Sequence, residues 1–212
     1  MYKNIFIKIF VFSFLILLFG SCCRVKKTYY PKGNLESKIR YCKNKMDGKA
    51  IWYYEATQKK RLEANYVNDT LHGKMIRYYY DGKVEDIKHF VKGSVEDTAF
   101  FYSKEGLLTH FYIYENSKKN GSFLYFYEDG QVQVKGNYKD NEYHGVWEYF
   151  DEEGFLVGEG KFDMGSGQLK RYNTQGNLVQ IRYYKNSQPT GEEIKYDSKG
   201  RVIASVQHSE EK

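Results

Sequence analysis

The stretch NEYHGVWEYFDEEG, residues 141–154, contains the pattern that recurs along most of the chain. It has two glycines nine residues apart, aromatic residues between them and a run of acidic residues directly before the second glycine. That second glycine marks a slot that returns at Gly33, Gly82, Gly106, Gly130, Gly154, Gly176 and Gly200, with Thr57 assigned to the one slot that lacks glycine. The successive intervals are 24, 25, 24, 24, 24, 22 and 24 residues. A period of this length predicts a repeat architecture.

Each repeat predicts one β-hairpin. An aromatic residue stands four positions before every slot, and we expect these residues to form the repeat core: Tyr29, Tyr53, Tyr78, Tyr102, Phe126, Phe150, Tyr172 and Tyr196. An aliphatic residue two positions after the slot and an aromatic residue about eight positions after it have the same parity, so all three are expected on one face. The acidic residues directly before the slot, followed by its glycine, are typical of tight turns. A polar loop such as residues 138–145 is expected between hairpins.

The predicted fold class is therefore all-β, an elongated single antiparallel meander sheet of about seven to eight hairpins over residues 29–208, followed by a charged tail at 209–212. One hairpin cannot bury its own face, so stability is expected from stacked neighbours. We expect the extra residue of the long interval as a bulge between Thr57 and Tyr66. The two residues missing from the short interval are expected to shorten the loop between Phe162 and Gly167. No long helix is predicted after residue 22.

The first residues are typical of a secretory signal. A lysine-containing start and an apolar run precede the small residues Gly20 and Ser21, and the run is shorter than a membrane-spanning helix requires. The segment up to Cys22 resembles a bacterial lipobox. That resemblance implies a lipoprotein signal peptide over residues 1–21, lipid attachment at Cys22, a lipidated basic tether over 22–28 and an outer-membrane anchor facing the periplasm. The alternatives are an ordinary signal peptide or an uncleaved anchor.

Composition narrows the class of protein. The chain is 28% charged, 41% hydrophobic and 18% aromatic, with 22 tyrosines, which is too apolar for a disordered chain and too polar for a multi-span membrane protein. The net charge of +6 falls by two when residues 1–21 are removed, because they hold two lysines and no acid. This small excess argues against nucleic acid as a partner.

No motif predicts catalysis, a metal site or a cofactor. The five histidines have no metal-ligand spacing, and the carboxylates at 151–153 lie on a predicted hairpin tip with nothing to hold a substrate. Three cysteines do not supply the disulfide framework of a small secreted domain. Cys42 is expected to be a small packed residue, and Cys23 to be free or incidental beside Cys22.

One pattern predicts a binding surface. Five positions before the slot, on the face opposite the predicted repeat core, stand aromatic and cationic residues: Trp52, Arg77, Phe101, Tyr125, Tyr149, Arg171 and Lys195. Stacked hairpins would align them as a stripe with a spacing of about 10 Å. Aromatic residues and arginine are enriched at interfaces. The simpler interpretation is that such side chains merely suit exposed strands and pair across them.

Over residues 29–205 the repeats resemble the MORN-repeat variant family, whose bacterial members include YwqK-type antitoxin components. The resemblance implies a non-catalytic scaffold that binds a protein, a glycan or a lipid surface in the bacterial envelope. The alternative is an antitoxin-like protein that neutralises a toxin by direct binding, and an envelope enzyme assembled from several loops is a third hypothesis. Unpaired sheet edges would also allow a homodimer.

Overall fold

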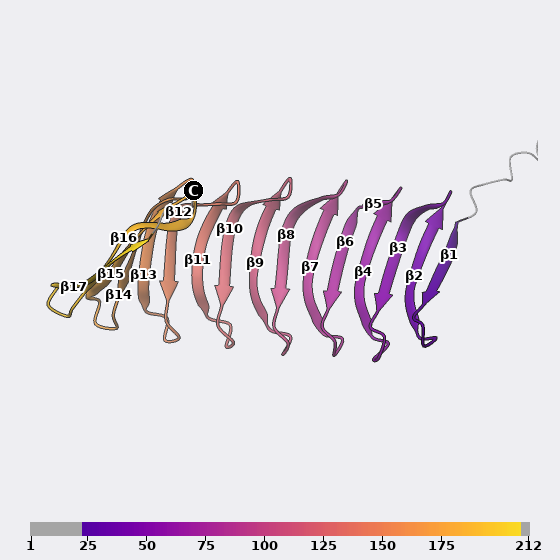
Figure 1. Cartoon of the computed structure of the whole chain (residues 1–212), viewed down its shortest axis with the longest axis horizontal. Coiled ribbons are helices and arrows are strands. Elements are labelled where there is room, and N and C mark those ends of the chain that lie inside the picture. Colours follow the sequence, from indigo (N-terminus) through magenta and orange to yellow (C-terminus); the bar gives the residue numbers. More distant parts are fainter. Residues whose placement is uncertain (1–22, 209–212) are drawn as a thin grey trace, which may run out of the picture.

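The described part of the chain forms a single antiparallel sheet, one layer thick (Figure 1). The computed structural model describes residues 23–208, in which 17 strands pair in chain order and no helix occurs. Figure 1 shows them side by side from β1 to β17. The strands are β1 (Arg24–Tyr29), β2 (Leu35–Cys42), β3 (Lys45–Tyr53), β4 (Lys60–Val67), β5 (Thr70–Leu71), β6 (Gly73–Tyr78), β7 (Val84–Val91), β8 (Ser94–Tyr102), β9 (Leu108–Glu115), β10 (Lys118–Phe126), β11 (Val132–Lys139), β12 (Glu142–Phe150), β13 (Leu156–Asp163), β14 (Ser166–Tyr172), β15 (Leu178–Lys185), β16 (Gln188–Tyr196) and β17 (Val202–His208). The short β5 and the following β6 both pair with β4. The predicted all-β meander of hairpin repeats is confirmed.

Two kinds of tight turn alternate along the sheet. One contains the slot glycine, as at Gly82 with a φ of 89°. The other has two successive residues with positive φ, as at Asp140 (52°) and Asn141 (76°), which is the type I′ geometry that suits a two-residue hairpin. The expectation of a polar loop at residues 138–145 is therefore wrong, because β11 and β12 continue to either side of these two turn residues.

The two repeats of irregular length absorb the change in unexpected places. In the long repeat the Tyr54 N–H donates to the Lys59 carbonyl at 2.9 Å, and Gln58 has a φ of 54°. The extra residue therefore lies in the turn, and Gln58 rather than Thr57 occupies the slot. In the short repeat β13 and β14 pair without the register shift that β11 and β12 show. The missing residues thus remove a strand bulge and do not shorten a loop before Gly167.

A bulge beside each slot turn changes which residues share a face. Tyr125 pairs with Val134 and Phe126 with Val132, so β11 has one residue left over between these pairs. Tyr138 lies four residues after Val134 on the same strand. Its side chain is consequently on the same face of the sheet as Tyr125 and on the other face from Phe126. The expectation that positions four before, two after and eight after the slot share one face is wrong for the last of the three. We call the face of Tyr125 and Tyr138 the front face, and the other the back face.

The predicted repeat core is not the buried core. Tyr29 is 57% exposed. The other seven residues of that set are only half-buried, on the back face: Tyr53, Tyr78, Tyr102, Phe126, Phe150, Tyr172 and Tyr196. The buried hydrophobic residues line the front face instead, because the bulge reverses the parity after each turn: Ile39, Ala50, Ala64, Phe90, Ala99, Phe123, Tyr138, Trp147, Phe162 and Leu169.

Tyrosine hydroxyls connect successive repeats. In four repeats the hydroxyl of the tyrosine that directly follows the predicted repeat-core residue donates to a backbone carbonyl of the next repeat at 2.6–2.8 Å: Tyr30 to Tyr53, Tyr54 to Tyr78, Tyr79 to Tyr102 and Tyr127 to Phe150. In later repeats this position holds Asp151, Asn173 or Asp197, whose side chains accept N–H groups of their own turn. Part of the tyrosine content is thus explained by hydrogen bonds between repeats, which were not predicted from the sequence.

A disulfide between Cys23 and Cys42 joins β1 to β2. Arg24 pairs with Tyr41, so the two cysteines stand opposite each other one step further along the ladder. The expectation of a packed Cys42 and of a Cys23 that is free or incidental is wrong, because the two cysteines are partners across the hairpin. The predicted leader at 1–21, the attachment site Cys22 and the tail at 209–212 lie outside the described residues.

Candidate binding face

Cross-strand pairing places the predicted stripe in one continuous row on the front face. The row runs through Ser37, Trp52, Leu62, Arg77, Asp86, Phe101, His110, Tyr125, Val134, Tyr149, Gly158, Arg171, Gln180, Lys195 and Ala204. We call these residues the front row. Successive stripe residues are two strands apart, which is about 10 Å. The stripe's alignment is thus a property of the register, and its role in binding stays a prediction.

Three stacked rings occupy the centre of the front row. The His110 imidazole lies 4.4 Å from the Phe101 ring at an interplanar angle of 7°, and 5.6 Å from the Tyr125 ring at 16°. Burial lowers the pKa of His110, and the charge of Lys119 lowers it further, so the neutral imidazole is favoured at pH 7. Because Tyr125 is 37% exposed, the stack offers an aromatic platform at the surface. His110 was not singled out in the sequence, since it comes from the strands between stripe residues.

A dense aromatic cluster supports this platform from β9 to β15. Its buried members are Phe123, Tyr138, Trp147, Phe162 and Leu169, and partly buried tyrosines pack against them. The Lys119 ammonium lies 3.8 Å from the centre of the Tyr112 ring and 4.9 Å from that of Tyr138. These are cation–π distances. Burial lowers the pKa of Lys119 and raises that of Tyr138.

A buried carboxylate fixes the cationic residue at one side of the stack. Asp86 is fully buried and accepts a hydrogen bond from Nε of Arg77, while the Lys88 ammonium lies 3.9 Å from its other oxygen. The Lys88 nitrogen is also 5.4 Å from the centre of the Phe101 ring. A buried charge is tolerated only when it is paired. Arg77, whose side chain is 46% exposed, is therefore held in place in the front row with part of its guanidinium open to solvent.

A second carboxylate has the same role near the end of the sheet. Glu193 is 4% exposed and accepts hydrogen bonds from Nε2 of Gln180 (2.6 Å), Nε of Arg182 (2.7 Å) and Nε2 of His208 (3.1 Å). Burial raises the pKa of Glu193, but these hydrogen bonds outweigh it and bring the pKa down to about 2. Lys195 of the front row lies 3.6 Å from the same carboxylate. Neither acid was predicted from the sequence, because the partners of both come from neighbouring strands.

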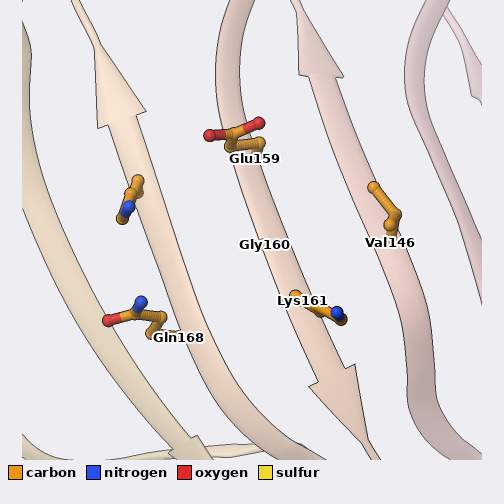
Figure 2. A pocket seen from close by; sticks show the side chains of 6 residues that line it. Val146, Glu159, Gly160, Lys161 and Gln168 are labelled. Atoms are coloured by element: carbon orange, nitrogen blue, oxygen red, sulfur yellow. The ribbon is translucent and has the colours of Figure 1, made fainter.

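Hollows in the surface are shallow. Figure 2 shows one on the back face, where Glu159 and Lys161 follow each other on β13 around Gly160, with Gln168 on β14 and Val146 on β12. Val146 is 57% exposed, and Glu159 and Lys161 are exposed as well. Such a site does not enclose a small molecule, so the geometry favours contact across an extended surface.

Within residues 23–208 no group of histidine, cysteine and acidic side chains could hold a metal ion. The same part of the chain has no helix that could cross a membrane. Asp151, at the hairpin tip that the sequence analysis considered for acid–base chemistry, accepts the Phe155 N–H within its own turn at 2.7 Å. Its side chain therefore has a structural role.

The comparisons with known proteins agree with this repeat geometry. A family model described as MORN repeat variant matches residues 25–43, 71–92, 119–140 and 166–186. Each match surrounds one slot turn and covers every second hairpin, namely β1–β2, β6–β7, β10–β11 and β14–β15. No curated protein matches the chain.

Proposed function

We propose that this chain, a MORN-variant repeat protein, is a non-catalytic binding scaffold whose front row holds its partner. The observation that carries the proposal is the front row itself. Seven aromatic or cationic residues from seven repeats lie in one line that is fixed by the pairing register of the strands, with a ring stack at its centre. A rigid sheet presents such a line without the entropy cost of ordering flexible loops.

The chemistry of the front row fits an extended protein or glycan partner. Aromatic rings supply contact area with few rotatable bonds, and arginine supplies several donors in a fixed plane. Arg171 is exposed, and Arg77 is oriented by Asp86. Repetition at about 10 Å favours a ligand that is long or itself periodic.

We further propose that the scaffold is anchored to a bacterial membrane through a lipid on Cys22. The lipobox-like segment before Cys22 supports this, as do the exposed basic residues Arg24, Lys26 and Lys27 of β1. Two or more acyl chains give stable attachment, to which basic residues add attraction for anionic lipids. Mass spectrometry of the N-terminus from membrane and soluble fractions tests this. A soluble chain that retains Met1 would contradict it.

The binding proposal is tested with the full chain immobilised and exposed to solubilised envelope proteins and to an envelope-glycan array. The triple variant Trp52→Ala, Tyr125→Ala, Tyr149→Ala should lose the ligand, whereas Tyr80→Ala, an exposed tyrosine outside the front row, should retain it. Undiminished binding by a folded triple variant would refute the role of the front row. Capture of a toxin would instead favour the antitoxin-like function.

A further inference from the structure

The back face has an apolar band in the middle of the sheet. Cross-strand pairs align five half-buried hydrophobic side chains from consecutive positions in the sheet: Ile76 on β6, Ile87 on β7, Phe100 on β8, Phe111 on β9 and Leu124 on β10. The Phe100 and Phe111 rings are 6.1 Å apart. No second layer covers this band in residues 23–208 (Figure 1). Contiguous apolar surface of this kind marks an interaction site.

The charges that border the band are arranged with reversed signs about β8. On one side Leu124 pairs with Lys135 of β11, whose ammonium lies 2.9 Å from Glu148 of β12. On the other side Ile76 pairs with Glu63 of β4, and the Glu63 carboxylate lies 2.6 Å from the ammonium of Lys49 on β3 and 2.7 Å from that of Lys60 on β4. Counted from β8, the inner charged residue of the row is therefore Glu63 on one side and Lys135 on the other, and each is paired within its own chain with residues of opposite charge. On β3 the residue paired with Glu63 is Ile51, and Lys49 lies two residues from it.

We infer that the back face binds a second copy of this chain, with the two sheets related by a two-fold axis parallel to β8. This axis sets β8 on its equivalent and β4 opposite β11 of the second copy. Glu63 then faces Lys135 of the second copy, and β3, which carries Lys49, faces β12, which carries Glu148. A two-fold axis across the strands would instead place Glu63 opposite Glu63, so charge complementarity selects the first arrangement.

The next charged position continues the same relation. On β2 the row holds Lys38, paired with Ile51, and at the same distance on the other side β13 holds Glu159, paired with Glu148. From β4 to β11 the facing region is about 29 Å wide at about 4.8 Å per strand. With about five residues of each strand in contact, the dimer buries about 1,000 Å², the lower limit for a specific interface. The dimer is therefore expected to be reversible and concentration-dependent, and it leaves the front row free.

Charge reversal tests this arrangement on the full chain, with sedimentation analysis over a range of concentrations. Glu63→Lys sets lysine against Lys135, and Lys135→Glu sets glutamate against Glu63, so each variant alone should weaken dimerisation by about tenfold or more. A mixture of the two variants places opposite charges at both contacts and should recover heterodimers. Neither loss of folding nor loss of a single ion pair within one chain produces that recovery.

The matched control is Glu192→Lys. Glu192 is an exposed carboxylate on the same face, but it lies on β16, beyond the edge of the second copy's sheet. This variant should dimerise like the unaltered chain. An unaltered chain that remains monomeric at about 100 μM would overturn the proposal. So would single variants that dimerise normally, or a mixture that remains monomeric. Ligand binding by the front row is measured separately and does not depend on these outcomes.

Discussion

Replacing Gly136 by alanine should test how the front-face core is packed. A Cβ atom built on Gly136 would lie 2.3–2.5 Å from three atoms of the Trp147 indole, and Trp147 is only 2% exposed. The ring also donates from Nε1 to the Asn137 carbonyl at 3.1 Å, which resists its displacement. Overpacking of a core costs about 1–3 kcal/mol. Gly136 does not have positive φ, so the added methyl would return about 0.4–1 kcal/mol by restricting the unfolded chain.

The net expectation is a loss of about 1–2 kcal/mol in the free energy of unfolding. Urea unfolding followed by circular dichroism measures it. A double-mutant cycle adds the variant Trp147→Ala. This variant alone should lower the free energy of unfolding by about 3–5 kcal/mol, because it leaves a cavity. In that background Gly136→Ala should cost nothing or be slightly stabilising, since the methyl then meets empty space. Equal costs of Gly136→Ala in both backgrounds, or no cost in the unaltered protein, would refute this packing of Trp147.

Three further outcomes can be measured. Tyr79→Phe removes the hydroxyl bond to the Tyr102 carbonyl and should cost about 0.5–1.5 kcal/mol in urea unfolding, whereas Tyr80→Phe should cost little. Because hydrogen bonds hold the pKa of Glu193 at about 2, its stabilising effect is complete above its unfolded pKa of about 4.3 and is lost as the pH falls to about 2; Glu193→Gln should remove that part of the acid sensitivity in pH-dependent unfolding. Cys42→Ser should destabilise the N-terminal hairpin by up to about 3 kcal/mol, visible as faster hydrogen exchange in β1 and not in β10.

The sequence predicts the hairpins well because each repeat contains its own turn-forming residues. Glycine at the slot, as at Gly82, has a positive φ that other residues rarely adopt. The face assignments fail because a bulge leaves no mark on the parity of the sequence. Tyr125 and Phe126 differ by one position, yet their partners on β11 differ by two. The position of the bulge depends on the turn geometry, so it cannot be found by counting residues along the sequence.

The candidate site was predicted in part. The stripe residues all lie before the slot turn, upstream of the bulge, so their common face follows from their common position. The residues between them lie after the bulge, on strands whose predicted face was wrong. His110 and Asp86, which stack on or hold stripe residues, were missed for this reason. Their contacts come from registers between strands, which are set by packing and turn geometry together.

The two irregular repeats show how strictly the front row depends on register. A shift of one residue in a strand moves every side chain to the other face. The extra residue of the long repeat lies in the turn at Gln58, so Trp52 still pairs with Leu62. The short repeat loses a bulge between β13 and β14, so Arg171 still pairs with Gly158. In both cases the change in length leaves the row unaffected, whereas a one-residue insertion inside β4 would move the rest of that strand's side chains to the other face. The alignment of the front row is therefore preserved in repeats of different length. A surface with this regular alignment suits the proposed binding of a periodic partner.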